Sequence, residues 1–231
     1  MDLKIIYFDI PFWRGEVARL PLFIADISFE DYRIKTAEEN NFLKENGRLK
    51  DGTLIPFRQL PVLVINGQSI AQTGGIARIC GKLSGMYPED MIEAGKVDQI
   101  IDTVTDINEL LNPSMRENDQ AKKKAMRVEL TNNDLPKYFG YLEDILNANN
   151  SSWFVGDKMS IADIAVWSLL GWIASGILDD IPPEIINPFE GLKKLYIEVN
   201  NNPRVREWKI KTYPQEKKSD KEYNLDVPDS I

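Results

Sequence analysis

The segment from Gln59 to Lys82, QLPVLVINGQSIAQTGGIARICGK, limits the possible folds more than any other part of the chain. It holds two short apolar runs around an Asn-Gly pair, which is the strongest short-range signal for a β-hairpin. A helical pattern follows directly after Gln72 and Thr73. The segment therefore predicts a unit of strand, turn, strand and helix, with a Leu-Pro step just before the first strand.

The residues before this unit extend it into a complete small α/β layer. Leu3 to Phe8 is typical of a strand, a helical pattern begins at Arg14, and Phe29 to Ile34 is a second strand pattern. Lys35 to Pro56 is a polar connection that we expect to be a long loop. The acidic residue at position 2 and the shortness of the first apolar run favour a strand over a signal peptide.

Only helical patterns follow residue 83. The stretch Ile161 to Ile177 is nearly all apolar, so we expect it to be a central buried helix. The other predicted helices cover Met91 to Met115, Ala121 to Leu146 with a kink at Pro136, Leu192 to Asn200 and Arg204 to Tyr213. We therefore predict an α/β domain over residues 1–83, an all-helical domain over 90–213 and a charged tail over 214–231.

Composition excludes several classes of function. The chain has 231 residues, a formal charge of −8 and a pI near 4.8, which argues against nucleic acid as the main partner. It has no histidine, so Ser-His-Asp, Cys-His and zinc-hydrolase chemistry are excluded. No apolar run approaches the ~18 residues of a membrane span. The single cysteine, Cys80, lies in an apolar helical pattern, and we expect it to be buried in a protein of a reducing compartment.

The order of three features resembles the glutathione S-transferases, and the sigma class in particular. These are Tyr7 at the end of the first strand, the QLPVL segment and the Gln72-Thr73 pair. The resemblance covers residues 3 to about 213. It implies a thioredoxin-like N-terminal domain, an all-α C-terminal domain, a homodimer in the cytoplasm, and transfer of glutathione, the co-substrate, to hydrophobic electrophiles without a metal.

The resemblance assigns the catalytic roles to Tyr7 and Arg14. The Tyr7 hydroxyl would stabilise the glutathione thiolate, which a free thiol of pKa about 8.5 forms only in part at neutral pH. Arg14, in a loop one residue longer than the sigma pattern, would support the tyrosine and the glutamyl end of glutathione. Taken without the resemblance, Tyr7 would be a core aromatic residue and Arg14 a surface residue of a first helical turn.

The glutathione-binding residues are implied in the same way. Leu60-Pro61 would be a cis step whose backbone pairs with the cysteinyl part, and Gln59 would contact the peptide. Thr73 would be an N-cap, so that Gln72, Thr73 and the free amides bind the γ-glutamyl carboxylate. Lys44 would bind the glycyl carboxylate, although Asn40 stands where relatives have an aromatic residue and residues 46–55 form an insertion.

Several residues of the helical part complete the resemblance. Asp106 would reach the γ-glutamyl amine of the partner subunit, and Asp102 lies one turn earlier. Thr105 replaces a third acidic residue, which lowers the expectation of a metal site. Ser160 begins a capping box at the buried helix. In the N-terminal part, Phe57 precedes the strand of the QLPVL segment, where an exposed aromatic residue would suit a dimer interface, and core packing is the alternative.

The second substrate would bind in an apolar pocket between the domains. Its predicted lining consists of Phe12, Trp13, Leu110, Leu111, Met115, Trp208 and Tyr213. Two alternatives to a transferase remain open from the sequence. One is a glutathione-dependent isomerase or peroxidase of the prostaglandin D synthase type, and the other is a weakly active ligand-binding or crystallin-like structural protein.

Overall fold

The computed structural model describes residues 1–213, and its N-terminal part is built on a four-stranded sheet of order β2-β1-β3-β4. Strand β1 (Leu3–Phe8) pairs in parallel with β2 (Glu30–Ile34) and antiparallel with β3 (Val62–Ile65). Strand β4 (Gln68–Ala71) closes a hairpin with β3. The prediction of the hairpin is confirmed, and its Asn66-Gly67 turn has φ of 48° and 80°.

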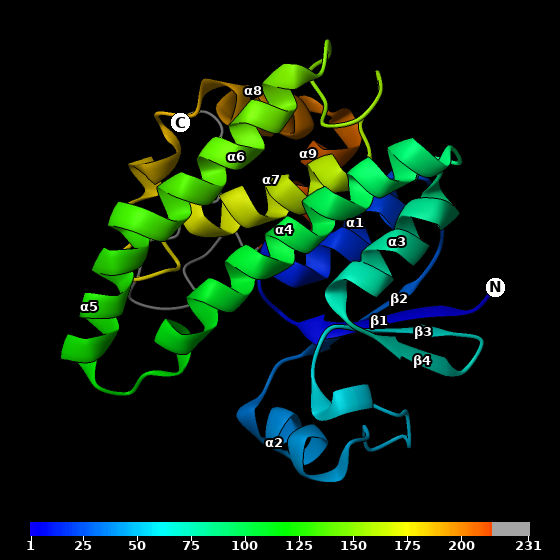
Figure 1. Cartoon of the computed structure of the whole chain (residues 1–231). Coiled ribbons are helices and arrows are strands. Elements are labelled where there is room, and N and C mark those ends of the chain that lie inside the picture. Colours follow the sequence, from blue (N-terminus) through cyan, green and yellow to red (C-terminus); the bar gives the residue numbers. More distant parts are fainter. Residues whose placement is uncertain (214–231) are drawn as a thin grey trace.

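The alternation of side chains along the strands divides the sheet into two buried faces. One face places Leu3, Ile5 and Leu63 against α1 (Glu16–Ile24) and α3 (Thr73–Ser84). Cys80 of α3 is part of this cluster and fully buried, as predicted. The opposite face carries Ile6, Val62 and Val64. Figure 1 shows α1 and α3 on one side of the sheet and α2 on the other.

The connection from Lys35 to Pro56, which the sequence predicts as a loop, contains the helix α2 (Ala37–Asn46). Its amphipathic signal is weak, because Leu43 is its only buried residue. Thr36 caps the helix by accepting from the Glu39 amide at 3.2 Å, and Gly47 ends it at φ 65°. The short helix η2 (Pro56–Arg58) then leads into β3.

The C-terminal part is an all-helical bundle around α7 (Ile161–Ala174), and every residue of α7 is buried. The predicted central helix is thus confirmed, and so is the capping box at its start: Asp163 accepts from the Ser160 amide at 2.7 Å. The surrounding helices are α4 (Met91–Arg116), α5 (Gln120–Glu129), α6 (Leu135–Ala148), α8 (Glu190–Asn201) and α9 (Pro203–Thr212), with short turns η1 (Trp13–Gly15), η3 (Leu130–Asp134) and η4 (Pro183–Ile186).

The helix predicted from Ala121 to Leu146, with a kink at Pro136, is present as α5, the π-helical turn η3 and α6. The turn η3 ends two residues before Pro136. Proline has no amide to donate and its ring crowds the preceding turn, so the backbone widens just before it. The tail predicted over 214–231 lies outside the described residues.

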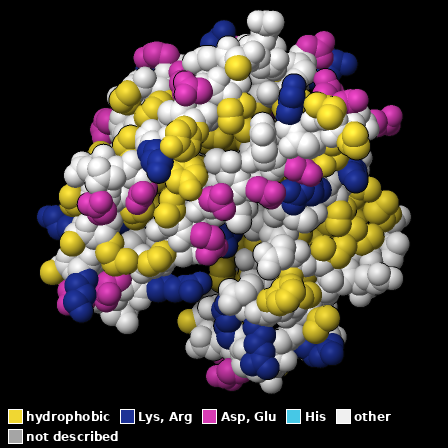
Figure 2. All heavy atoms as spheres, viewed as in Figure 1, with side chains coloured by type: hydrophobic (Ala, Val, Ile, Leu, Met, Phe, Trp, Pro, Cys, Tyr) yellow, Lys and Arg dark blue, Asp and Glu magenta, His cyan; other side chains and the backbone are white. Residues whose placement is uncertain are grey.

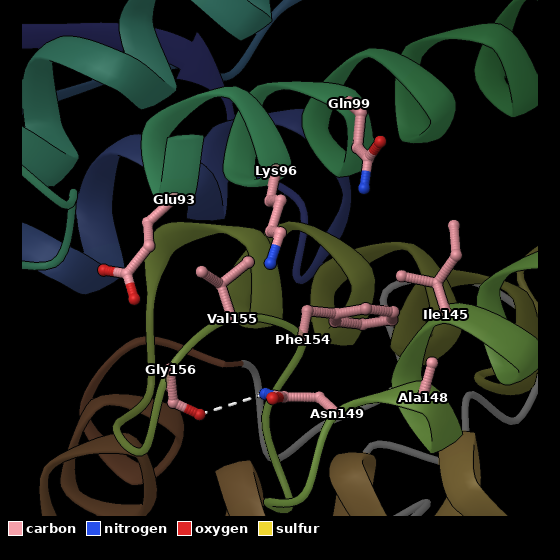
Figure 3. Close-up of a pocket in the computed structure, with 9 residues that line it drawn as sticks. All are labelled: Glu93, Lys96, Gln99, Ile145, Ala148, Asn149, Phe154, Val155 and Gly156. Carbon is pink, nitrogen blue, oxygen red and sulfur yellow. Dashed lines mark hydrogen bonds between the residues drawn. The ribbon is translucent and has the colours of Figure 1, made fainter. Parts of the chain in front are cut away.

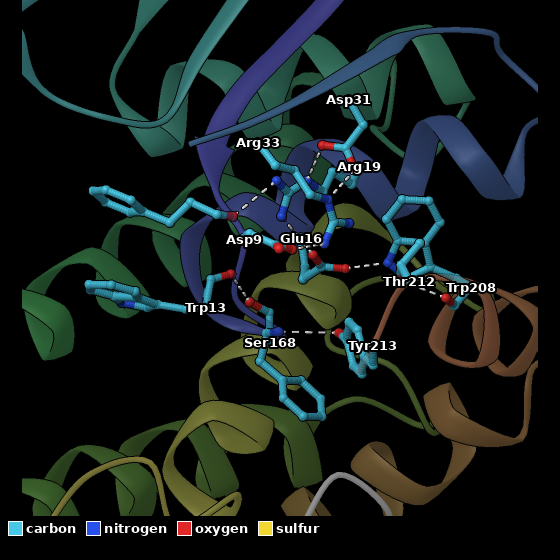
Figure 4. Close-up of polar contacts among 12 residues, drawn as sticks. Asp9, Trp13, Glu16, Arg19, Asp31, Arg33, Ser168, Trp208, Thr212 and Tyr213 are labelled. Atoms are coloured by element: carbon cyan, nitrogen blue, oxygen red, sulfur yellow. Dashed lines mark hydrogen bonds and ion pairs between the residues drawn. The ribbon is translucent and has the colours of Figure 1, made fainter. Parts of the chain in front are cut away.

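A buried charged network joins the two parts (Figure 4). Glu16 and Arg19 of α1 are fully buried and lie 3.3 Å apart, and Arg19 also pairs with Asp31 of β2 at 2.8 Å. The indole of Trp208 in α9 donates to Glu16. Because a buried charge left without its partner is strongly destabilising, this network fixes α1 against both β2 and α9.

Candidate functional site

The register of the sheet places three predicted site residues side by side. Ile6 of β1 is opposite Val62 of β3, which is opposite Ala71 of β4. The next residues along this row are Tyr7, Pro61 and Gln72, all at one end of the sheet. The Leu60-Pro61 bond is cis, so the prediction of a cis step is confirmed.

Tyr7 is held tightly on every side. Its side chain is 1% exposed, and burial raises the pKa of its hydroxyl well above the ordinary value. A backbone hydrogen bond from Arg14 and the charges of Arg14 and Arg19 oppose this rise. A Cβ atom at Gly15 would come within 2.5 Å of the Tyr7 ring, so only glycine fits there. The phenol is therefore neutral at physiological pH and can donate a hydrogen bond.

The loop after β1 is anchored in the helical bundle by Phe12. The ring of Phe12 is fully buried against Gly171 of α7, where a Cβ atom would lie only 2.3 Å from it. The Phe12 amide donates to the Tyr213 hydroxyl at 3.3 Å. Phe12 and Trp13 both have positive φ, at 56° and 62°, which non-glycine residues rarely adopt. The longer loop thus reaches from the sheet into the core of the other domain.

Trp13 forms a stack beside Tyr7. Its indole lies parallel to that of Trp172 at a centroid distance of 4.5 Å, and its Nε1 donates to Asn108 at 2.7 Å. The guanidinium of Arg14 lies 5.3 Å from the centroid of the Trp13 ring. Arg14 also contacts Glu109 and Asn112 of α4, each at 3.4 Å. Arg14 is thus held between the loop and α4.

Two polar residues of the predicted glutathione site, Lys44 and Gln59, lie together. Lys44 of α2 donates to the Gln59 side chain at 2.9 Å. Burial lowers the pKa of Lys44, and the charge of Arg116 lowers it further. Asn40, which stands at the position of the usual aromatic residue, has a buried Oδ1 with no hydrogen bond in the described part of the chain.

The start of α3 corrects one prediction. Thr73 is the first helical residue, and Gln72, with φ of 73°, takes the N-cap position that we predicted for Thr73. The Gln72 side chain makes no capping hydrogen bond within the described residues. The predicted anion site therefore rests on the free amides of the first turn. A Cβ atom at Gly74 would lie 2.9 Å from the Arg78 guanidinium, so glycine leaves room for that side chain beside the turn.

The acidic residues of α4 separate into paired and exposed ones. Arg78 of α3 binds Asp98 at 2.7 Å and Asp102 at 2.8 Å. Asp106 is exposed on the same helix. The structure holds one chain, so the predicted reach of Asp106 into a partner subunit stays a prediction. No group of three metal-binding side chains comes together within residues 1–213.

The predicted electrophile pocket is divided by burial. Trp13, Leu110 and Met115 are partly exposed. Phe12, Leu111, Trp208 and Tyr213 are core residues, each at most 4% exposed. The three aromatic residues among them are packed in the core: the Phe12 amide donates to the Tyr213 hydroxyl, and the Trp208 indole donates to Glu16.

Sequence reasoning missed Asn108, Trp172 and Gly15. Asn108 offered a signal, since it is a polar residue at an apolar position of the α4 stripe and is 5% exposed. Trp172 gave none, because the part of the helix around it is apolar and wholly buried. None of the helices that the structure describes is long and apolar enough to cross a membrane.

Comparison with known proteins agrees with this architecture. Residues 3–78 match the family model of the glutathione S-transferase N-terminal domain, and residues 105–212 match that of the C-terminal domain. Human glutathione S-transferase A2 is 30% identical over 84% of this chain and 82% of its own length.

Two solved structures extend the comparison. Prostaglandin synthase D of Nilaparvata lugens has a TM-score of 0.79 at 30% identity, covering 93% of this chain and 99% of that one. A monomeric glutathione S-transferase of the hookworm Necator americanus has a TM-score of 0.72 at 28% identity, covering 94% and 100%. With both domains matched and the thioredoxin-like sheet joined to a helical bundle, the chain belongs to the glutathione S-transferase family.

Proposed function

We propose that this protein is a glutathione transferase that joins the sulfur of glutathione to apolar electrophiles. The row of Tyr7, cis Pro61 and Gln72 at one end of the sheet carries the proposal. In this row, the Tyr7 hydroxyl, the backbone beside Pro61 and the first amides of α3 lie near one another, so one small peptide can bind to all three. Membership of the family supports the same activity.

Tyr7 is proposed as the catalytic residue. Its buried phenol keeps its proton, because burial raises its pKa, and donates it to the sulfur in a hydrogen bond. This bond stabilises the thiolate, and a thiol pKa lowered by about two units corresponds to about 2.7 kcal/mol. The thiol proton leaves to solvent, and the thiolate forms the C–S bond as the leaving group of the electrophile departs.

Glutathione would lie along the row from Gln72 to Lys44. Its γ-glutamyl carboxylate would bind at the first amides of α3, and its glycyl carboxylate at Lys44, which Gln59 positions. Leu60 would pair its backbone with the cysteinyl part. In a homodimer, Asp106 would contact the γ-glutamyl amine of the glutathione that is bound to the partner subunit. One structural relative is monomeric, so analytical ultracentrifugation of this protein is a direct test of the proposed dimer.

The electrophile would bind over Trp13, Leu110 and Met115, the partly exposed members of the predicted pocket. These residues lie on the first loop and on α4, beside Tyr7, whose ring centroid is 6.1 Å from that of Trp13. Apolar side chains of this kind favour hydrophobic electrophiles. Which electrophile reacts best then depends on the shape of the pocket. A cytoplasmic location remains our expectation.

A second candidate activity is glutathione-dependent isomerisation of the prostaglandin D synthase type, within a sigma-like class. The similarity to prostaglandin synthase D of Nilaparvata lugens favours it. Both activities need the same thiolate, so Tyr7 has one role in each. Turnover of prostaglandin H2 to D2, measured beside conjugation, separates the two.

The test is Tyr7→Phe, assayed with glutathione and 1-chloro-2,4-dinitrobenzene. We expect kcat to fall about 100-fold, as for loss of one preorganised donor, with little change in the KM for glutathione. Tyr141→Phe is the matched control, because Tyr141 is 51% exposed on α6. If the wild type binds glutathione and Tyr7→Phe keeps full activity, the role of Tyr7 is wrong.

A further inference from the structure

Three cations face the notch between α2 and the C-terminal end of α4. Figure 2 shows this notch, with a Lys or Arg side chain at its edge. Arg14 is already bound to Glu109 and Asn112, and Lys44 is bound to Gln59. Arg116 makes no ion pair with an acidic side chain of residues 1–213. Lys44 has only the neutral Gln59 side chain as its partner, and the Arg116 side chain alone of the three has neither a hydrogen bond nor an ion pair within residues 1–213.

The helical repeat places Arg116 beside the proposed site. Glu109, Asn112 and Arg116 recur every three or four residues, so they share one face of α4. Arg14 contacts the first two of them, and Arg116 lies about one turn further, at the exposed end of the helix. Arg116 therefore lies on the face of α4 that Arg14 contacts, directly after Met115 of the proposed electrophile site.

The charge of Arg116 also acts across the notch. It is close enough to Lys44 to help lower the pKa of that side chain, so the two cations repel each other in the free protein. In the proposed function the glycyl carboxylate of glutathione neutralises Lys44, and the γ-glutamyl carboxylate binds at α3. Glutathione then has no carboxylate left for Arg116.

We propose that Arg116 selects electrophiles that carry a carboxylate, by binding that carboxylate at the pocket rim while the apolar body of the electrophile lies over Trp13 and Met115. This inference rests on the proposed function and names the substrate class of the same site. A guanidinium pairs with a carboxylate through two parallel hydrogen bonds, so it also orients the electrophile. Neutral electrophiles would still react, without this anchor.

The experiment uses two product analogues and needs no turnover. S-hexylglutathione and S-(5-carboxypentyl)glutathione differ only in the terminal group of the chain, and calorimetry gives Kd for each. In the wild type we expect the carboxylate form to bind at least as tightly as the hexyl form. Arg116→Gln should weaken the carboxylate form about fivefold and leave the hexyl form unchanged. Arg116→Lys should restore part of the difference.

Lys96→Gln is the matched control. Lys96 lies on the same helix, 20 residues or about 30 Å away. It faces a separate hollow of about 300 Å³ between α4 and residues 154–156, shown in Figure 3. Its loss should change neither Kd, whereas a general effect of net charge would change the carboxylate form in both variants.

The outcomes separate this inference from the function beneath it. If neither analogue binds and Tyr7→Phe changes nothing, the proposed function is wrong, and the inference is wrong with it. If both analogues bind and Arg116→Gln weakens them equally, Arg116 binds the glycyl carboxylate and the inference alone is overturned. Equal affinities of Arg116→Gln and the wild type for the carboxylate form would also overturn it.

Discussion

The two halves of the proposed site are built from contacts of very different range. In the glutathione half, Lys44 and Gln59 are 15 residues apart. Pro61 directly precedes the hairpin of β3 and β4, and Gln72 directly follows it. In the electrophile half, Trp13 bonds to Asn108, 95 residues away, and the Phe12 amide to Tyr213, 201 residues away. The first half is set by local turns and strand pairing, and the second by packing between domains.

This difference suggests how one family can serve many electrophiles. The glutathione half keeps its geometry whenever the hairpin forms, so it suits glutathione, the co-substrate that all these reactions share. The loop from Phe12 to Arg14 can change in length as long as the helical bundle accepts it. Here two residues with positive φ, each costing about 1–3 kcal/mol, are held by the fit of Phe12 against Gly171.

The largest effect should come from Gly171→Ala, which attacks that fit. The new Cβ would lie 2.3 Å from the Phe12 ring, so the ring or α7 must move. We expect the free energy of unfolding to fall by about 2 kcal/mol, measured by urea denaturation. In the folded fraction, affinity for glutathione should persist while conjugation falls.

Gly95→Ala controls for the change of helix propensity, because a Cβ at Gly95 in α4 meets nothing within 4 Å. Adding Phe12→Ala to Gly171→Ala removes the overlapping ring, so the two effects should not add. If Gly171→Ala abolished glutathione affinity in folded protein, the two halves would not be independent and the comparison would fail.

The same difference in sequence separation explains which features of the structure can be predicted from the sequence and which cannot. The hairpin, the cis step and the capping box at Ser160 are local patterns, and all are present. The helix α2 was missed, because Leu43 is its only buried residue. The burial of Trp208 could not be predicted either, because it depends on a hydrogen bond to Glu16, 192 residues away.

A medium effect is expected for Gly15→Ala, at the junction of the halves. Its Cβ would come within 2.5 Å of Cδ1 of Tyr7 and 2.9 Å of Arg19. Displacing the phenol by a fraction of an ångström should lower kcat about tenfold, because its hydrogen bond to sulfur needs close geometry. Steady-state kinetics should show an unchanged KM for glutathione. An equal loss in Gly95→Ala would assign the effect to stability.

The smallest effect should come from Lys44→Gln, within the glutathione half alone. Losing one partly exposed charge at the glycyl carboxylate should raise the Kd for S-hexylglutathione about fivefold and leave kcat unchanged. Burial and Arg116 lower the pKa of Lys44, so its ammonium loses charge at a lower pH than an ordinary lysine. The advantage of the wild type over the variant should therefore be complete at neutral pH and vanish as pH rises through that lowered pKa. Calorimetry across this range measures the ratio of the two Kd values, and a ratio independent of pH would show that Lys44 does not bind the carboxylate as a cation.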